Sequence, residues 1–168
     1  RDDHRLLVIV GPCSIHDVDA AYEYAERLHR LNEEVGEHLL LVMRTYFEKP
    51  RTTVGWRGLI ADPYLDGSHD MVAGVRVARE LLARLNELGI GCATESLDPS
   101  LVNFTDDLVA WTALGARTSE SQIHRAMASG LPMPVGIKTG TLGQVDIALD
   151  AIETVASAQS YLAPDESG

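Results

Sequence analysis

Five cationic side chains stand where this sequence could assemble a site for a multiply charged anion. Residues 46–58 read YFEKPRTTVGWRG and place Lys49, Arg51 and Thr52 around a proline. Guanidinium groups pair with phosphate and carboxylate oxygens, while a lysine acts as a point charge. If such cations lie close together at the opening of one site, they repel one another unless an anion is bound. The five cations are Arg44, Lys49, Arg51, Arg117 and Lys138.

A cysteine and a carboxylate add further chemistry near these cations. Cys13 follows an apolar run, and as a thiolate it could bind a divalent metal ion together with Glu95. Cys13 could equally be a small buried core residue. Glu95 could instead pair with an arginine. His16 forms a C-x-x-H pair with Cys13, and its spacing favours an exposed polar residue over a metal ligand.

The cations could also have structural roles that involve no ligand. Arg51 and Thr52 could belong to a solvated loop, since loops are generally polar. Lys138, followed by Thr139 and Gly140, could simply close a strand. None of these residues by itself indicates a particular function.

The composition limits the class of protein. With 168 residues, 45% of them hydrophobic, the chain can bury one core. The net charge of -11 argues against nucleic acid or a membrane surface as a general partner. No apolar run approaches the roughly 20 residues of a membrane span, and the first residues lack the zones of a signal peptide. Two cysteines fit a reducing compartment, so we expect a cytoplasmic protein.

Short apolar runs alternate with amphipathic stretches along the whole chain. The first run, 6–14, predicts a strand buried on both faces. Asp17 should cap the helix that follows and Gly36 should end it. The further predicted strands are 38–44, 90–95, 115–119 and 134–138, with a possible sixth at 160–162. The further predicted helices are 70–89, 101–111, 121–129 and a stretch around 148–155.

This alternation predicts a parallel sheet, either doubly wound or closed as a (β/α)₈ barrel. Polar residues at five successive strand ends favour the barrel, because barrels build their sites from successive strands. A barrel usually needs about 250 residues. We therefore predict one partial α/β domain over 1–168, an incomplete (β/α)₈ TIM-type barrel of about five βα units.

Five motifs together make a family resemblance visible. The chain closely resembles the type I 3-deoxy-D-arabino-heptulosonate 7-phosphate (DAHP) synthases over essentially its whole length. The resemblance implies a metal-dependent transferase that condenses phosphoenolpyruvate with erythrose 4-phosphate, the first step of the shikimate pathway to chorismate and the aromatic amino acids. The motifs are GPCSIHD (11–17), MRTYFEKPRTTVGWRGLI (43–60), ATESLD (93–98), GARTSESQIHR (115–125) and PVGIKTGT (134–141).

The resemblance also implies a role for each candidate residue. Arg51 and Thr52 match positions that hold the phosphate of erythrose 4-phosphate. Cys13 matches a ligand of the divalent metal, which could be Mn²⁺, Fe²⁺, Co²⁺ or Zn²⁺. Glu95 matches a catalytic carboxylate near phosphoenolpyruvate and its attacking water, and Lys49 could protonate the new alkoxide. The positions that match the phosphoenolpyruvate site are Arg44, Lys49, Arg117 and Lys138.

The sequence departs from the family at several points. The family's other metal ligands, a His, a Glu and an Asp, lie on strands beyond those found here, and Leu142 replaces an aspartate common after GT. We therefore expect an inactive fragment of a protein that forms a homo-oligomer, a dimer or tetramer. A non-catalytic half-barrel that binds phosphorylated ligands or a complementary chain is the alternative. The related octulosonate 8-phosphate synthases are a further one, with a different loop signature.

Overall fold

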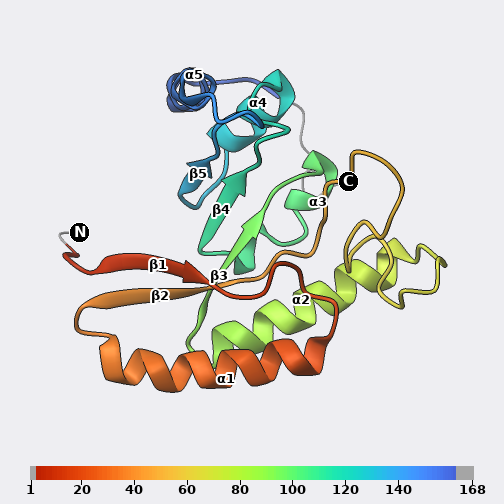
Figure 1. Ribbon diagram of the computed structural model, residues 1–168, viewed down its shortest axis with the longest axis vertical. Helices are drawn as coiled ribbons and strands as arrows, with labels where there is room; N and C mark the ends of the chain where they lie inside the picture. The colour runs from red at the N-terminus through yellow and green to blue at the C-terminus, as the bar shows by residue number, and fades with distance from the viewer. Residues whose placement is uncertain (1–2, 162–168) are drawn as a thin grey trace. The chain divides into compact units, whose positions relative to one another are not determined.

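The structure, a computed structural model, describes residues 3–161 as strands followed in turn by helices (Figure 1). Neighbouring strands are hydrogen-bonded in chain order, β1-β2-β3-β4-β5. That order confirms an incomplete (β/α)₈ barrel, because a doubly wound sheet reverses its order at a switch point. The elements are β1 (Leu6–Val10), α1 (Val18–Val35), β2 (Leu39–Arg44), α2 (Met71–Glu87), β3 (Gly91–Glu95), α3 (Pro99–Val102), the 3₁₀ helix η1 (Asp106–Leu108), β4 (Trp111–Leu114), α4 (Gln122–Ser129), β5 (Val135–Ile137) and α5 (Val145–Ala156).

Contacts within the chain divide it into two compact units. Among the described residues, unit 1 comprises 3–94 and 108–110, and unit 2 comprises 95–107 and 111–161. Among the described residues, no helix has the length and apolarity that a membrane crossing requires. The single domain over 1–168 stays a prediction.

In unit 1, helix α1 forms as its sequence predicts. The Asp17 side chain accepts a hydrogen bond from the Ala20 amide at 2.9 Å, and Gly36 is the C-terminal cap. Ala21, Ala25 and Leu28 recur at helical spacing and are buried. Figure 1 shows α1 running beside the parallel pair β1 and β2.

Helix α2 is the second predicted helix of unit 1. Its cap is Asp70, whose side chain accepts from the Ala73 amide at 3.0 Å. The buried stripe contains Ala78, Leu82 and Leu85. The ends of the helix and its buried stripe therefore confirm the sequence prediction.

Strand β1 corrects the prediction of a strand buried on both faces. Leu6 is 66% exposed and Leu7 is 43% exposed. Strand β1 pairs only with β2, so it is an outer strand of the described sheet. The strand also ends at Val10, and residues 11–14 form a loop rather than its continuation.

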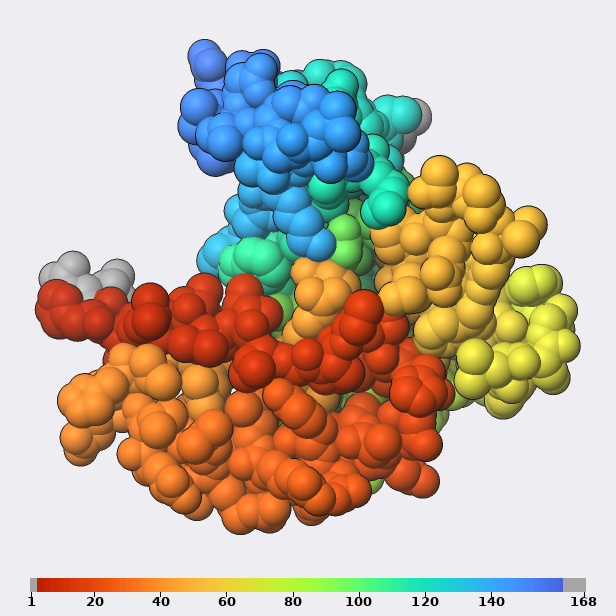
Figure 2. All heavy atoms as spheres, in the orientation of Figure 1, coloured from red at the N-terminus to blue at the C-terminus, as the bar shows by residue number. Residues whose placement is uncertain are grey.

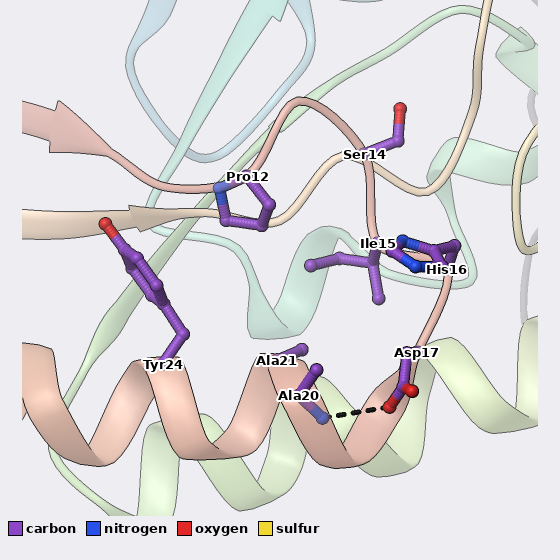
Figure 3. Close-up of a pocket in the computed structure, with 8 residues that line it drawn as sticks. All are labelled: Pro12, Ser14, Ile15, His16, Asp17, Ala20, Ala21 and Tyr24. Carbon is purple, nitrogen blue, oxygen red and sulfur yellow. Dashed lines mark hydrogen bonds between the residues drawn. The ribbon is translucent and has the colours of Figure 1, made fainter.

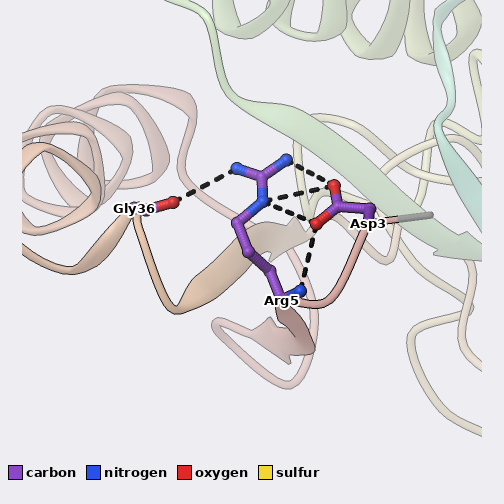
Figure 4. Close-up of polar contacts among 3 residues, drawn as sticks. All are labelled: Asp3, Arg5 and Gly36. Carbon is purple, nitrogen blue, oxygen red and sulfur yellow. Dashed lines mark hydrogen bonds and ion pairs between the residues drawn. The ribbon is translucent and has the colours of Figure 1, made fainter. Parts of the chain in front are cut away.

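The start of β1 is fixed by one arginine (Figure 4). Arg5 donates from Nη2 to Asp3 Oδ2 at 2.7 Å and from Nη1 to the Gly36 carbonyl at 3.3 Å. The hydrogen bond from Arg5 lowers the pKa of the Asp3 carboxyl to about 2. Arg5 therefore ties the residues before β1 to the end of α1.

In unit 2, β4 and β5 pair in parallel, with Thr112 opposite Val135 and Leu114 opposite Ile137. Helices α4 and α5 follow these strands as predicted, beginning after Ser121 and Gln144. Gly140 stands between β5 and α5. The possible sixth strand at 160–162 extends outside the described residues, and 160–161 form no strand.

The predicted helix 101–111 is wrong. Helix α3 ends at Val102, after which Phe104 and Thr105 make hydrogen bonds only three residues back. Trp111 begins β4, so the fourth strand is WTAL rather than residues 115–119. Residues 115–119 form a turn, with the Thr118 amide donating to the Gly115 carbonyl at 3.0 Å.

A glycine in α2 tests how closely this helix packs on the preceding loop. A Cβ at Gly74 would overlap the main-chain atoms of Ile60. Alanine has the higher helix propensity by about 1 kcal/mol, but overpacking costs about 1–3 kcal/mol and cannot be relieved by a side-chain rotation here. We expect Gly74→Ala to lower the urea midpoint of unfolding. Val72→Ala, at a 73% exposed position of the same helix, should leave the midpoint unchanged or raise it. A Gly74→Ala protein as stable as the native one would contradict the close packing.

Candidate active site

The chain beyond β2 remains extended and is hydrogen-bonded on both sides. The Thr45 amide donates to the Ala93 carbonyl at 2.7 Å, and the Ile15 amide donates to the Tyr46 carbonyl at 2.9 Å. Gly11 permits the close approach of the β1–α1 loop, because a Cβ there would lie 2.9 Å from the Arg44 carbonyl oxygen. Its φ of +155° also disfavours other residues. Residues 11–15 and 44–46 are thus held together.

Arg44 ends β2 and points its guanidinium group across this junction. Its Nη2 donates to the Cys13 carbonyl at 3.1 Å. Its guanidinium carbon lies 3.7 Å from the centroid of the Tyr46 ring, a cation–π contact. The Nε atom is buried and has no hydrogen-bond partner among the described residues. Arg44 therefore retains donor capacity for an anion.

Lys49 reaches the same loop. Its Nζ lies 3.3 Å from Cys13 Sγ and 3.4 Å from Ser14 Oγ. The hydrogen bond and the charge of Lys49 lower the pKa of the Cys13 thiol, with Arg44 and Ser14 as smaller causes. Cys13 is exposed, which excludes the alternative of a buried core residue. Cys92, by contrast, is buried, and burial raises the pKa of its thiol to about 12.

Arg51 and Thr52 lie further along this loop and are exposed. The Arg51 Nε donates to the Trp56 carbonyl at 2.8 Å, so the side chain folds back over its own loop. The Trp56 indole donates to the Asp62 carbonyl at 2.9 Å. Figure 2 shows this segment and the one that follows it, in orange and yellow, adjacent at the surface of unit 1.

In unit 2, the sequence candidates centre on an ion pair between a buried carboxylate and a partly exposed lysine. Lys138 Nζ lies 3.1 Å from Glu95 Oε2, with the Glu95 side chain 8% exposed and that of Lys138 40% exposed. The structure thus pairs Glu95 with a lysine, where the alternative interpretation had an arginine. A Cβ at Gly115 would overlap Glu95 Oε1, so the carboxylate needs a glycine beside it.

Arg117 does not end a strand, which corrects its predicted position. It lies exposed in the turn after β4, two residues beyond Gly115. The structure therefore brings Cys13, Arg44 and Lys49 together in unit 1, and Glu95 and Lys138 together in unit 2. Sequence reasoning missed Ser14, Tyr46 and Gly115. Tyr46 carried a usable signal, because residues two apart in an extended segment share a side.

A pocket of about 100 Å³ lies between the β1–α1 loop and the first turns of α1 (Figure 3). Its lining includes Pro12, Ile15, Ala21 and Tyr24 and is largely apolar. His16 lies at its edge and is exposed, as the sequence favours. None of the candidate cations lines this pocket, so it is not the anion site.

The described residues do not fit a complete metal centre. No group of three His, Cys, Asp or Glu side chains among residues 3–161 is arranged to hold an ion. Cys13 has the property required of one ligand, because its thiol loses a proton more readily than usual. Any further ligands would have to come from outside this set.

The Cys13–Lys49 contact predicts the pH at which the thiol becomes reactive. Because Lys49 stabilises the thiolate, the midpoint of Cys13 alkylation by iodoacetamide should lie below that of an ordinary thiol. Lys49→Met should shift this midpoint to higher pH, while Arg76→Met on exposed helix surface should not. Mass spectrometry resolves Cys13 from Cys92, which should stay unlabelled in the folded chain. An unchanged midpoint in Lys49→Met would contradict the contact.

Comparisons with known proteins agree with this arrangement of strands. The sequence profile of the DAHP synthetase I family matches residues 2–165. A solved structure of phospho-2-dehydro-3-deoxyheptonate aldolase from Francisella tularensis superposes with a TM-score of 0.96 at 47% identity, covering 99% of this chain and 49% of that one.

Curated relatives are similar over the same range. The Trp-sensitive phospho-2-dehydro-3-deoxyheptonate aldolases of Enterobacter agglomerans and of Escherichia coli K12 are each 56% identical over 167 residues, 99% of this chain and 48% of each relative. The Tyr-sensitive aldolase of Salmonella typhimurium is 54% identical over 166 residues, 47% of its length. The chain thus spans about half the length of the curated relatives it matches. It belongs to the DAHP synthetase I family.

Proposed function

We propose that the protein acts as a 3-deoxy-7-phosphoheptulonate synthase (EC 2.5.1.54). The reaction joins phosphoenolpyruvate, erythrose 4-phosphate and water to give DAHP and phosphate, the first step of the shikimate pathway. The observation that carries the proposal is the group formed by Arg44 at the end of β2, Lys49 in the loop that follows it, and Cys13 in the loop after β1. Family membership supports it, since the relatives bear the name of this aldolase.

Phosphoenolpyruvate is proposed to be held by the four cations that match the family motif, Arg44, Lys49, Arg117 and Lys138. Arg44 has a buried donor without a protein partner, and it can offer a planar edge to phosphate or carboxylate oxygens. Lys49 and Lys138 would add point charges, and Arg117 is exposed in a turn from which its side chain can reach a ligand. Each assignment rests on the matching motif.

Erythrose 4-phosphate is proposed to bind on the loop that follows β2. Arg51 and Thr52 would hold its phosphate, with the guanidinium group already oriented by the Trp56 carbonyl. Their exposure leaves them accessible to a ligand from solution. Holding two anions at adjacent positions would raise the effective concentration of the reacting carbons.

The proposed chemistry moves one proton at Lys49 and uses one water near Glu95. A bond forms from C3 of phosphoenolpyruvate to the aldehyde carbon of the sugar, and the aldehyde oxygen takes a proton held at Lys49 Nζ. Water then adds to C2 and gives up one proton, which restores the protonated lysine. The bond between C2 and the phosphate oxygen breaks as the C2 carbonyl forms, and phosphate leaves with the second proton of the water. Glu95 would orient that water, while Lys138 holds the carboxylate in place at 3.1 Å.

Cys13 is proposed as one ligand of a divalent metal, Mn²⁺, Fe²⁺, Co²⁺ or Zn²⁺, which would supply Lewis-acid chemistry in the complete site. We also propose a homo-oligomer, a dimer or tetramer, on the family resemblance alone. A cytoplasmic location is proposed because both described cysteines are free. The net charge of -11 opposes a nucleic-acid partner.

The first test is release of phosphate from phosphoenolpyruvate in the presence of Mn²⁺ and erythrose 4-phosphate. It should be run on the 168-residue chain and on the whole gene product that contains it. We expect Lys49→Ala to lower kcat about 100-fold or more, because it removes the proton donor and a binding cation.

Arg57→Ala is the matched control for Lys49→Ala. Arg57 lies exposed in the same loop, and its main-chain carbonyl, which accepts from the Lys49 amide, would be retained. Activity should then stay near that of the native protein. Product formation that survives Lys49→Ala would refute the role of Lys49, and absence of product in the whole gene product would refute the function.

A further inference from the structure

Tyr46 has no role in the assignments above, yet its ring contacts the guanidinium group of Arg44. It stands two residues after Arg44 in the extended chain, so both side chains lie on one side of that segment. The Arg44 guanidinium carbon lies 3.7 Å from the centroid of the Tyr46 ring. A planar cation at this distance is attracted by the negative face of the ring.

The ring of Tyr46 is a rigid support. The residue is only 5% exposed. Its carbonyl accepts from the Ile15 amide at 2.9 Å, and the amide of its neighbour Thr45 donates to the Ala93 carbonyl at 2.7 Å. These main-chain bonds hold the segment in place, and the burial of Tyr46 limits the rotation of its ring.

The contacts of Arg44 leave a defined edge of the guanidinium group for a ligand. One face is covered by the Tyr46 ring, and Nη2 donates to the Cys13 carbonyl at 3.1 Å. Nε is buried without a hydrogen-bond partner among residues 3–161. A buried donor in this condition is costly unless an acceptor arrives, and an anion in the guanidinium plane would supply one.

We propose that Tyr46 is a positioning residue that fixes the plane in which Arg44 meets the phosphate or carboxylate of phosphoenolpyruvate. The inference rests on the proposed function and deepens it. Tyr46 acts through Arg44 and touches no reacting atom. Its contribution therefore falls on binding of phosphoenolpyruvate and leaves binding of erythrose 4-phosphate alone.

Steady-state kinetics of the whole gene product test whether Tyr46 affects binding of phosphoenolpyruvate and not of erythrose 4-phosphate. Tyr46→Leu should raise KM for phosphoenolpyruvate about three- to thirtyfold, the range expected for loss of a cation–π contact. KM for erythrose 4-phosphate should not change. Tyr46→Phe keeps the ring and should restore most of the affinity. In an Arg44→Lys background, Tyr46→Leu should add little, because the planar cation is already gone.

A spectroscopic readout separates positioning from mere stability. In the folded protein, the ring current of Tyr46 should shift the Arg44 side-chain proton signals upfield. The shift should persist in Tyr46→Phe and vanish in Tyr46→Leu. Circular dichroism checks folding, and if the leucine variant does not fold, Tyr46→Met fills the space with a flexible apolar chain.

Different results would overturn the role of Tyr46 and the proposed function. Equal KM values for phosphoenolpyruvate in the phenylalanine and leucine variants would overturn the inference while the enzyme stays active. If the native protein makes no product, the proposed function fails, and titration with inorganic phosphate still decides the role of Tyr46. Equal phosphate affinity in the native, phenylalanine and leucine proteins would then overturn it. Weaker phosphate binding in the leucine variant alone would support it.

Discussion

Main-chain hydrogen bonds that continue past the end of β2 determine where the charged side chains of unit 1 can lie. The Thr45 amide bonds to the strand on one side, and the Tyr46 carbonyl bonds to the β1–α1 loop on the other. Gly11 is needed because any side chain there would meet the Arg44 main chain. Main-chain hydrogen bonds therefore position the β1–α1 loop and Arg44. Their placement does not depend on side-chain contacts between them.

The charges of the site are balanced locally in each unit. Repulsion among clustered cations led us to expect that an anion is required to hold them together. Instead, Arg44 and Lys49 are already opposed by the carbonyl and sulfur of Cys13, and Lys138 by the carboxylate of Glu95. A ligand at Lys138 would compete with the Glu95 carboxylate, whereas a ligand at Arg44 would add a partner for Nε. At Lys138 the net gain is consequently smaller than bare charges would give, and geometry matters more.

The sequence predicts the fold well wherever a local signal is unambiguous. Asp17 and Asp70 cap helices whose buried stripes follow the helical period, and both helices form as expected. The prediction fails over 101–111, where apolar residues three and four apart also fit a turn followed by a short strand. Phe104 illustrates the ambiguity, since it matches the helical stripe but is 50% exposed. Periodicity over so few residues cannot separate the two structures.

The residue types of the candidate site can be predicted from the sequence, but which residues contact one another cannot. A cation at a strand end is visible in the sequence where the apolar run before it ends there, as at Arg44, but the same reasoning misplaced Arg117, which lies in a turn. Which acceptor it meets depends on residues far away in the chain, as with Lys49 and Cys13, and no local pattern encodes that contact. Tyr46 is the exception. The spacing of two in an extended segment places Tyr46 and Arg44 on one side of that segment. The sequence therefore indicates locally which residue can support the arginine, although it does not indicate the ligand.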